Sequence, residues 1–407
     1  MILNLAWRNI WRNPTRSMVV IVAIALGIWA AMFMSGFATG MVQSYVDNAI
    51  ANRVSHLQIH HPQYEEDMDI QFSLGRVEEL KAQLKETDNI NGVSYRTLAN
   101  GMLASSKTSR AVRIRGIDPT AEHAVTGLQE HVESGTYFEG DRKNQILLSE
   151  RLADKLGVKL KKKVVLTFQD KDREIVAAAF RVVGFYDTGN NIFDDVHVFV
   201  KTGDIQRLLA PESEKSIYHE AAILLKDKAG MDLLQEQLKS KFPSLLVGNY
   251  RERAPDVELY ESMLGSLSLI YLIIIMLALV FGIINTMLMA VLERLRELGM
   301  LMAIGMNKLK VFLMIVTETL LLTLVGAPVG LALGALTVAY VGKRGLDLSA
   351  FSSTMEMYGM ANVVYFDLAP AVYWQVVIVV SLTAILASIY PALKAIRLRP
   401  VEAIRKL

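Results

Sequence analysis

LGSLSLIYLIIIMLALVFGIINTMLMAVLERLRELGMLMAIG, the stretch from Leu264 to Gly305, decides the fold of this chain. Its first part, Leu264–Leu292, contains no charged residue. A transmembrane helix needs about 20 mostly apolar residues, so this part predicts a membrane span. The second part, Glu293–Gly305, mixes charged and apolar residues at helical spacing, which predicts a short amphipathic helix after the span.

Three further stretches are long and apolar enough to cross a membrane. They are Ser17–Met41, Val311–Gly342 with the single charge Glu318, and Ala371–Leu393. The first, which follows several arginines, could instead be a cleaved signal peptide, but its apolar core exceeds the roughly 7–15 residues of such peptides. We therefore expect four transmembrane helices.

The composition agrees with a chain that is only partly in the membrane. Hydrophobic residues make up 52% of its 407 residues, and the mean hydropathy is +0.31. A net charge of +2 gives no sign of nucleic-acid binding. The absence of cysteine excludes disulfides and thiolate metal sites. The sequence contains neither the phosphate-binding Gly-x-x-x-x-Gly-Lys-Ser/Thr motif nor the Gly-x-Ser-x-Gly motif that carries the nucleophilic serine of many hydrolases.

The distribution of Lys and Arg predicts the orientation of the spans. Basic residues are concentrated in the N-terminal segment (1–16), in the segment 293–310 and in the C-terminal tail (394–407), so these segments are expected to be cytoplasmic. The segments 42–263 and 343–370 are then extracytoplasmic. The predicted fold is an α-helical membrane protein with one span before, and three spans after, a large external domain.

The external segment 42–263 alternates strand and helix patterns, which predicts a mixed α/β domain. Glu150–Leu156, for example, is a predicted helix that ends at Gly157. Other predicted helices are 74–86, 204–209 and 231–242, and predicted strands are 54–61, 111–117, 145–149, 164–168, 175–185, 196–200, 221–225 and 245–247. The order of the strands does not follow from this pattern.

Two amphipathic segments flank the spans on the cytoplasmic side. In the first, Leu3, Trp7, Ile10 and Trp11 share one helical face, which predicts a helix lying at the membrane interface. In the second, Gly305 is a natural helix stop and Asn307 a natural cap of the next helix. The apolar face of this second segment could bind a soluble partner or lie on lipid, and its sequence pattern alone favours neither. That face consists of Leu295, Leu298, Leu301 and Met302.

Several stretches together resemble the MacB/LolC/FtsX-type permeases of ABC transporters. They are Glu293–Gly305 followed by the span with Glu318, the ending Tyr390–Arg405 (YPALKAIRLRPVEAIR), the opening Ala6–Pro14 (AWRNIWRNP), and the external stretches Ile146–Leu156 and Phe180–Gly189. The resemblance covers the whole chain, and within the family it is closest to the lipoprotein-releasing LolC/LolE branch, on the stretch His56–Pro62.

The resemblance implies a mechanism called mechanotransmission. Two permeases, identical or paralogous, pair in the bacterial inner membrane, and each docks one ATPase subunit, which carries the ATP and Mg. No cofactor is then expected on this chain, which is not itself an enzyme. A periplasmic carrier or adaptor is a further partner that the family leaves open. The expected ATPase-docking residues are Arg294, Leu295, Arg296, Glu297, Leu298, Leu301, Met302 and Ile304.

Small residues at four-residue spacing let helices approach closely in lipid. These rows predict either permease pairing or packing within the chain. They are Ala23, Gly27, Ala31 and Ser35 in the first span, and Gly326, Gly330 and Gly334 in the third.

A charge such as Glu318 is costly at the bilayer centre. We expect it near the cytoplasmic interface, paired with Lys310 or with a basic residue of another chain, rather than in proton transfer.

Three functions remain open at this stage. The first is a permease that extracts lipoproteins or other amphiphiles from the outer leaflet, the second a transducer that activates an external protein, and the third a peptide or drug efflux permease.

The Met- and Tyr-rich loop Ser349–Phe366 either contacts substrate or simply connects two spans. His56, His60 and His61 lie together, but the strand period separates their faces, so no metal site is predicted.

Overall fold

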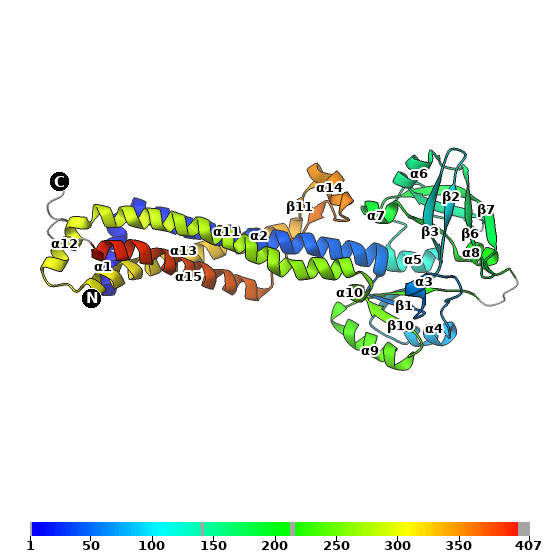
Figure 1. Cartoon of the computed structure of the whole chain (residues 1–407), viewed down its shortest axis with the longest axis horizontal. Helices are drawn as coiled ribbons and strands as arrows, with labels where there is room; N and C mark the ends of the chain where they lie inside the picture. The colour runs from blue at the N-terminus through cyan, green and yellow to red at the C-terminus, as the bar shows by residue number, and fades with distance from the viewer. Residues whose placement is uncertain (1, 139, 141, 212–215, 398–407) are drawn as a thin grey trace. The chain divides into compact units, whose positions relative to one another are not determined.

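The computed structural model describes residues 2–138, 140, 142–211 and 216–397. It divides into two compact units. The helical unit comprises Met1–Val42, Ser262–Leu346 and Val363–Leu407, and the sheet unit comprises Gln43–Glu261 and Asp347–Asn362. Two helices, α2 (Pro14–Ala49) and α11 (Pro255–Glu293), contribute residues to both units (Figure 1).

Four helices are long and apolar enough to cross a membrane, as the sequence predicts. They are α2, which continues into a short π-helical turn to Val54, α11, α13 (Lys308–Arg344) and α15 (Pro370–Arg397). Two shorter helices accompany them, α1 (Ile2–Arg12) and α12 (Leu295–Ala303). The predicted tail beyond Arg397 lies outside the described residues.

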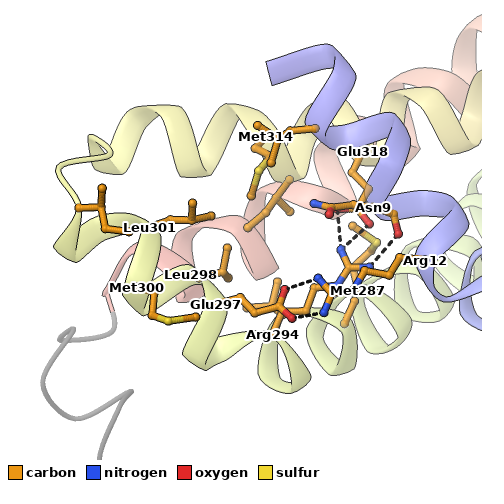
Figure 2. A pocket seen from close by; sticks show the side chains of 15 residues that line it. Asn9, Arg12, Met287, Arg294, Glu297, Leu298, Met300, Leu301, Met314 and Glu318 are labelled. Atoms are coloured by element: carbon orange, nitrogen blue, oxygen red, sulfur yellow. Dashed lines mark hydrogen bonds and ion pairs between the residues drawn. The ribbon is translucent and has the colours of Figure 1, made fainter. Parts of the chain in front are cut away.

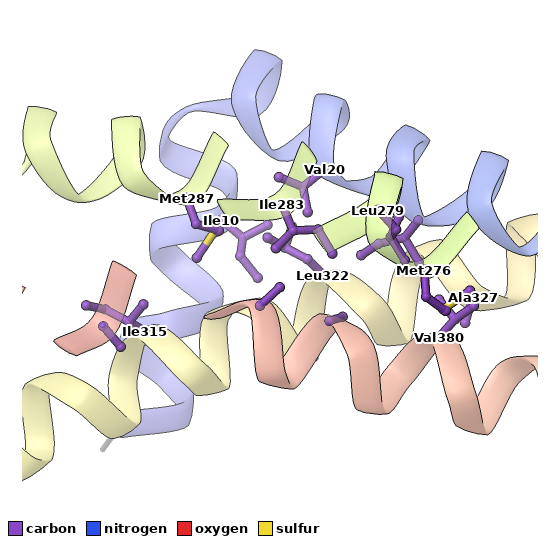
Figure 3. Close-up of a cluster of buried hydrophobic side chains, with 14 of the residues drawn as sticks. Ile10, Val20, Met276, Leu279, Ile283, Met287, Ile315, Leu322, Ala327 and Val380 are labelled. Carbon is purple, nitrogen blue, oxygen red and sulfur yellow. The ribbon is translucent and has the colours of Figure 1, made fainter. Parts of the chain in front are cut away.

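The helical unit is held together by apolar side chains from α1, α2, α11, α13 and α15 (Figure 3). Glycines bring α13 close to α2: a Cβ added at Gly330 would lie 2.7 Å from the carbonyl oxygen of Ala25. Gly326 and Gly334 likewise face α2, and Gly27 faces Leu279 of α11. Both small-residue rows therefore serve packing within the chain, and a role in pairing with a second permease stays a prediction.

The sheet unit is mixed α/β, with a ten-stranded sheet among the described residues. The strand order is β10-β1-β9-β2-β3-β8-β5-β7-β4, with β6 pairing β2 and β7. The strands are β1 (Leu57–His60), β2 (Ile90–Ala104), β3 (Ser109–Ile117), β4 (Val132–Gly135), β5 (Gln145–Ser149), β6 (Lys163–Gln169), β7 (Ile175–Tyr186), β8 (His197–Lys201), β9 (Glu220–Leu225) and β10 (Leu246–Asn249). The helices are α3 (Tyr64–Asp67), α4 (Val77–Lys85), α5 (Pro119–Thr126), α6 (Glu150–Leu156), α7 (Asn191–Asp194), α8 (Thr202–Leu209), α9 (Met231–Lys241), α10 (Tyr250–Arg253) and α14 (Ser352–Met357).

Every strand and helix predicted for the external segment is found within a few residues of its expected position. The helix α6 is confirmed together with its end at Gly157, whose φ of +63° is the left-handed conformation that glycine adopts readily. The central strand β2 was not predicted. Gly101 lies inside this strand, where β6 approaches so closely that a Cβ would meet the Thr167 carbonyl oxygen at 2.5 Å.

The segment between α13 and α15 is shared between the units. Its middle part, Asp347–Asn362, belongs to the sheet unit, where the Ala361 N–H donates to the Ser44 hydroxyl at 2.9 Å. Phe366 is buried in the helical unit and packs edge-on against Phe33 and Phe37. Met357 and Tyr358 are exposed. Part of the segment is therefore a packed connection between two spans. Contact of its exposed residues with a substrate stays a prediction.

Candidate functional site

Helix α12 is set apart from its neighbours by two breaks in the backbone. Arg294 leaves the helical conformation, with φ −97° and ψ 14°, and so separates α11 from α12. Gly305, with φ +104°, lies just beyond the end of α12. The Asn307 side chain then accepts a hydrogen bond from the Leu309 N–H at 3.2 Å and caps α13. The predicted stop and cap are both confirmed, and they give a short helix in the turn between two spans.

The two faces of α12 differ in exposure. Leu298 is only 5% exposed and joins the apolar core of the helical unit, and Met302 packs against the same core. The predicted apolar face is therefore turned inward at these two positions. The outward face carries Arg296, Met300 and Ile304 at four-residue spacing, and Ile304 is 85% exposed. Exposed apolar side chains grouped on one face, here Met300 and Ile304, are typical of a protein-binding surface or of an interface with lipid.

Two ion pairs fasten α12 to the rest of the helical unit (Figure 2). Arg12 of α1 forms a two-pronged ion pair with Glu297, with one N–O distance of 3.0 Å. Arg294 donates to the Glu318 carboxylate of α13 at 3.2 Å and to the Asn9 carbonyl oxygen of α1 at 2.8 Å. These contacts attach α12 and its junction with α11 to both α1 and α13.

The partner predicted for Glu318 was wrong. Lys310 is exposed on the first turn of α13, two helical turns from Glu318, whereas Arg294 reaches Glu318 directly from the end of α11. Glu318 is 8% exposed. A buried carboxylate requires a paired charge, and removal of one partner leaves the other uncompensated. The predicted structural role, in place of proton transfer, agrees with this pairing.

A cavity of about 440 Å³ is bounded by α1, α11, α12 and α13, and its lining includes the exposed Met300 and Ile304. Its lining is largely apolar and includes Leu5, Met287, Leu301, Met314 and Ile315, with Arg294 and Glu318 at its polar side (Figure 2). Because this space is not filled by side chains, α12 is held mainly by its ion pairs and by Leu298 and Met302.

The N-terminal helix differs from its prediction at one residue. Ile10 is buried in the core of the helical unit, because α1 packs against α13 through this side. Leu3, Trp7 and Trp11 are exposed in a row at four-residue spacing, and the two indoles contact each other edge-on. An exposed aromatic row next to the charged Arg8 suits a membrane interface.

The histidines after the first span are structural. His56 accepts a hydrogen bond from the Leu225 N–H at 2.9 Å, and the His60 ring lies 3.1 Å from the His219 carbonyl oxygen. Among the residues that the structure describes, no three His, Asp or Glu side chains are arranged to hold a metal ion.

Sequence reasoning missed the residues that anchor α12. Arg12 and Asn9 lie 285 residues from their partners Glu297 and Arg294, so no local pattern links them. The only available signal was charge: an arginine at the end of α1 and a glutamate on α12, both predicted to be on the cytoplasmic side.

Two family models match the chain. The model described as "MacB-like periplasmic core domain" matches residues 17–241, and the model described as "FtsX-like permease C-terminal" matches residues 269–400. The first therefore covers more than half of the chain. The second covers α12 and most of the three later candidate spans.

Individual relatives agree with these matches. An uncharacterized ABC transporter permease of Mycobacterium tuberculosis is 23% identical over 310 residues, which is 75% of this chain and 34% of that protein. The macrolide export ATP-binding/permease protein MacB of Chromobacterium violaceum is 32% identical over 149 residues, 36% of this chain and 21% of that protein. The chain thus spans only about a third of the first of these relatives and about a fifth of the second. The lipoprotein-releasing system transmembrane protein LolE of Haemophilus influenzae is 20% identical over 351 residues, 80% of each chain.

Proposed function

Because the chain belongs to the MacB/FtsX/LolC family of ABC transporter permeases, we propose that α12 is the docking element for a separate ATPase subunit. The observation that carries this proposal is the combination of an outward face with a firm inward attachment. Arg296, Met300 and Ile304 are exposed, while Arg12 and Glu318 tie the same short segment to α1 and α13.

ATP hydrolysis then performs work through mechanical transmission. Movement of the docked ATPase pulls on α12, and the ion pairs pass this movement to α1 and α13. Helices α2 and α11 contribute residues to both units, so displacement of the helical unit is passed on to the sheet unit along continuous helices. ATP and Mg reside on the ATPase, of which two copies serve a pair of permeases.

The permease lies in the bacterial inner membrane with α1, α12 and the C-terminal tail in the cytoplasm and the sheet unit in the periplasm. Lys and Arg near the span ends support this orientation. The exposed Leu3, Trp7 and Trp11 of α1 then lie at the cytoplasmic headgroup layer.

The substrate is a lipoprotein or another amphiphile of the outer leaflet, which the sheet unit helps to release. The support is the extent of the LolE alignment, 80% of both chains, whereas the MacB match covers 21% of that relative. A periplasmic carrier would accept the released substrate.

Docking is tested by co-expressing the chain with candidate ATPase subunits and measuring co-purification in detergent. The variant Ile304→Asp places a charge at the most exposed apolar side chain of the proposed docking face. Ile175→Asp is the matched control, since Ile175 is 74% exposed and lies in the sheet unit. We expect the complex with wild type and with Ile175→Asp, and its loss with Ile304→Asp. Equal capture of the ATPase by both variants would place docking elsewhere.

A further inference from the structure

The sheet unit contains a cavity of about 430 Å³ that the proposed coupling does not use. Part of its lining follows from strand register. Asn100 of β2 pairs with Arg113 of β3, and Arg113 pairs with His197 of β8. Residues directly opposite in adjacent strands project to the same face of a sheet. All three line the cavity, so a polar row crosses its floor.

Arg115 follows Arg113 by two residues and therefore projects from the same face. It lines the cavity although it is only 7% exposed, and its guanidinium stacks on the Phe193 ring at 5.1 Å. Its Nη1 is buried without a hydrogen-bond partner, and its Nη2 lies 3.5 Å from the Arg53 carbonyl oxygen, which is a weak contact at best. A buried donor without an acceptor is costly.

The carboxylates that line the cavity are bonded to other arginines. Asp256 accepts from Arg53 at 2.7 Å, and Glu220 accepts from the buried Arg96 at 2.5 Å. Within the described residues, neither Arg113 nor Arg115 forms a salt bridge. Burial and the neighbouring Arg96 lower the pKa of Arg115 to about 10, so this side chain still carries its charge at neutral pH.

The remainder of the lining includes the apolar residues Val54, Met68 and Leu98. Ala99 and Ile114 also border the cavity, but their side chains belong to the buried core on the opposite face of the sheet. A volume of this size suits a small organic ligand. The cavity thus offers two cationic side chains without a carboxylate partner next to an apolar wall.

We propose that this cavity binds a small amphipathic anion, whose carboxylate or phosphate group is held by Arg113 and Arg115 and whose apolar part lies against the apolar wall. Guanidinium groups bind such oxyanions through two parallel hydrogen bonds, which would satisfy the free Nη1 of Arg115. The site is independent of ATPase docking, because every residue that lines it belongs to the sheet unit.

The test uses the full chain in detergent and measures binding of hexanoate and of hexyl phosphate by isothermal titration calorimetry, with hexanol as the neutral probe. Arg113→Gln and Arg115→Gln remove the proposed ligand contacts. Arg113 is exposed, so its variant is expected to fold even if Arg115→Gln does not. The control is Arg110→Gln, an exposed arginine of the same strand that does not line the cavity.

We expect at least one of the two anions to bind, hexanol not to bind, and affinity to fall at least tenfold in Arg113→Gln while Arg110→Gln binds like wild type. The relative affinity for the two anions identifies the headgroup. Failure of wild type to bind either anion, or binding that is equal in Arg113→Gln and wild type, would overturn the proposal.

Discussion

The ion pair between Arg294 and Glu318 makes the sharpest prediction about the helical unit. Both side chains are about 11% exposed, so the pair is shielded from water. Replacing Arg294 with Met removes the positive charge, leaves the Glu318 carboxylate buried without a counter-charge and deprives the Asn9 carbonyl oxygen of its donor. Breaking a buried pair in this way costs about 3–5 kcal/mol. We expect Arg294→Met to lower the free energy of unfolding of the helical unit by this amount.

The exposed pair between Arg12 and Glu297 supplies the comparison. Their side chains are 60% and 37% exposed, and an exposed ion pair contributes about 1 kcal/mol or less. Arg12→Met should therefore destabilise the chain several-fold less than Arg294→Met. The double variant Arg294→Met with Glu318→Met should recover most of the loss, since replacing both charges by apolar side chains removes the uncompensated carboxylate.

Unfolding by a denaturing detergent, followed by tryptophan fluorescence, measures these differences. All four tryptophans, Trp7, Trp11, Trp29 and Trp374, belong to the helical unit, so the signal reports on it. If Arg294→Met were no less stable than Arg12→Met, or if the double variant were as unstable as the single one, the assignment of a buried, stabilising pair would be refuted.

Two further predictions concern helix packing and pH. Gly330→Leu should separate α13 from α2, because even a Cβ there would meet a carbonyl oxygen at 2.7 Å. The same unfolding assay should show a loss of stability for Gly330→Leu. The control Gly282→Leu, at a position with open space around it, should show no such loss. Burial raises the pKa of Asp194 from 3.8 to about 7, so the folded sheet unit binds a proton that the unfolded chain releases, and its stability should fall as pH rises from about 4 through about 7. Thermal unfolding of Asp194→Asn by circular dichroism should show a weaker decline over that range; an unchanged decline would contradict the assignment.

Much of the helical unit could be predicted from the sequence because its signals are local. Each span is a long apolar run with no charge or, in α13, with Glu318 alone, and the end of α12 and the start of α13 are marked by Gly305 and Asn307. The strand β5 and the helix α6 were predicted at their observed bounds, since an apolar run and the terminal Gly157 mark them. The structure adds Ser149 as the N-terminal cap of α6.

The remaining features depend on contacts between distant parts of the chain. Strand β2 could not be predicted because its glycines are required by close approach of distant backbone, helix α5 at Gly92 and strand β6 at Gly101, which no local pattern reveals. The partners of Glu318 and Glu297 come from helices that only folding brings together. The row of Asn100, Arg113 and His197 depends on strand order and register, and alternation along β3 alone could show only that Arg113 and Arg115 share a face.

The most direct test of the central claim is photo-crosslinking from α12 to an ATPase subunit. A photoreactive amino acid is placed at Ile304 on the exposed face, or at Ile175 in the sheet unit as a control, and the permease is co-expressed with the ATPase that co-purifies with it. We expect a crosslink to the ATPase from position 304 and none from position 175. The absence of a crosslink from position 304 in a complex that still contains the ATPase would contradict docking at α12.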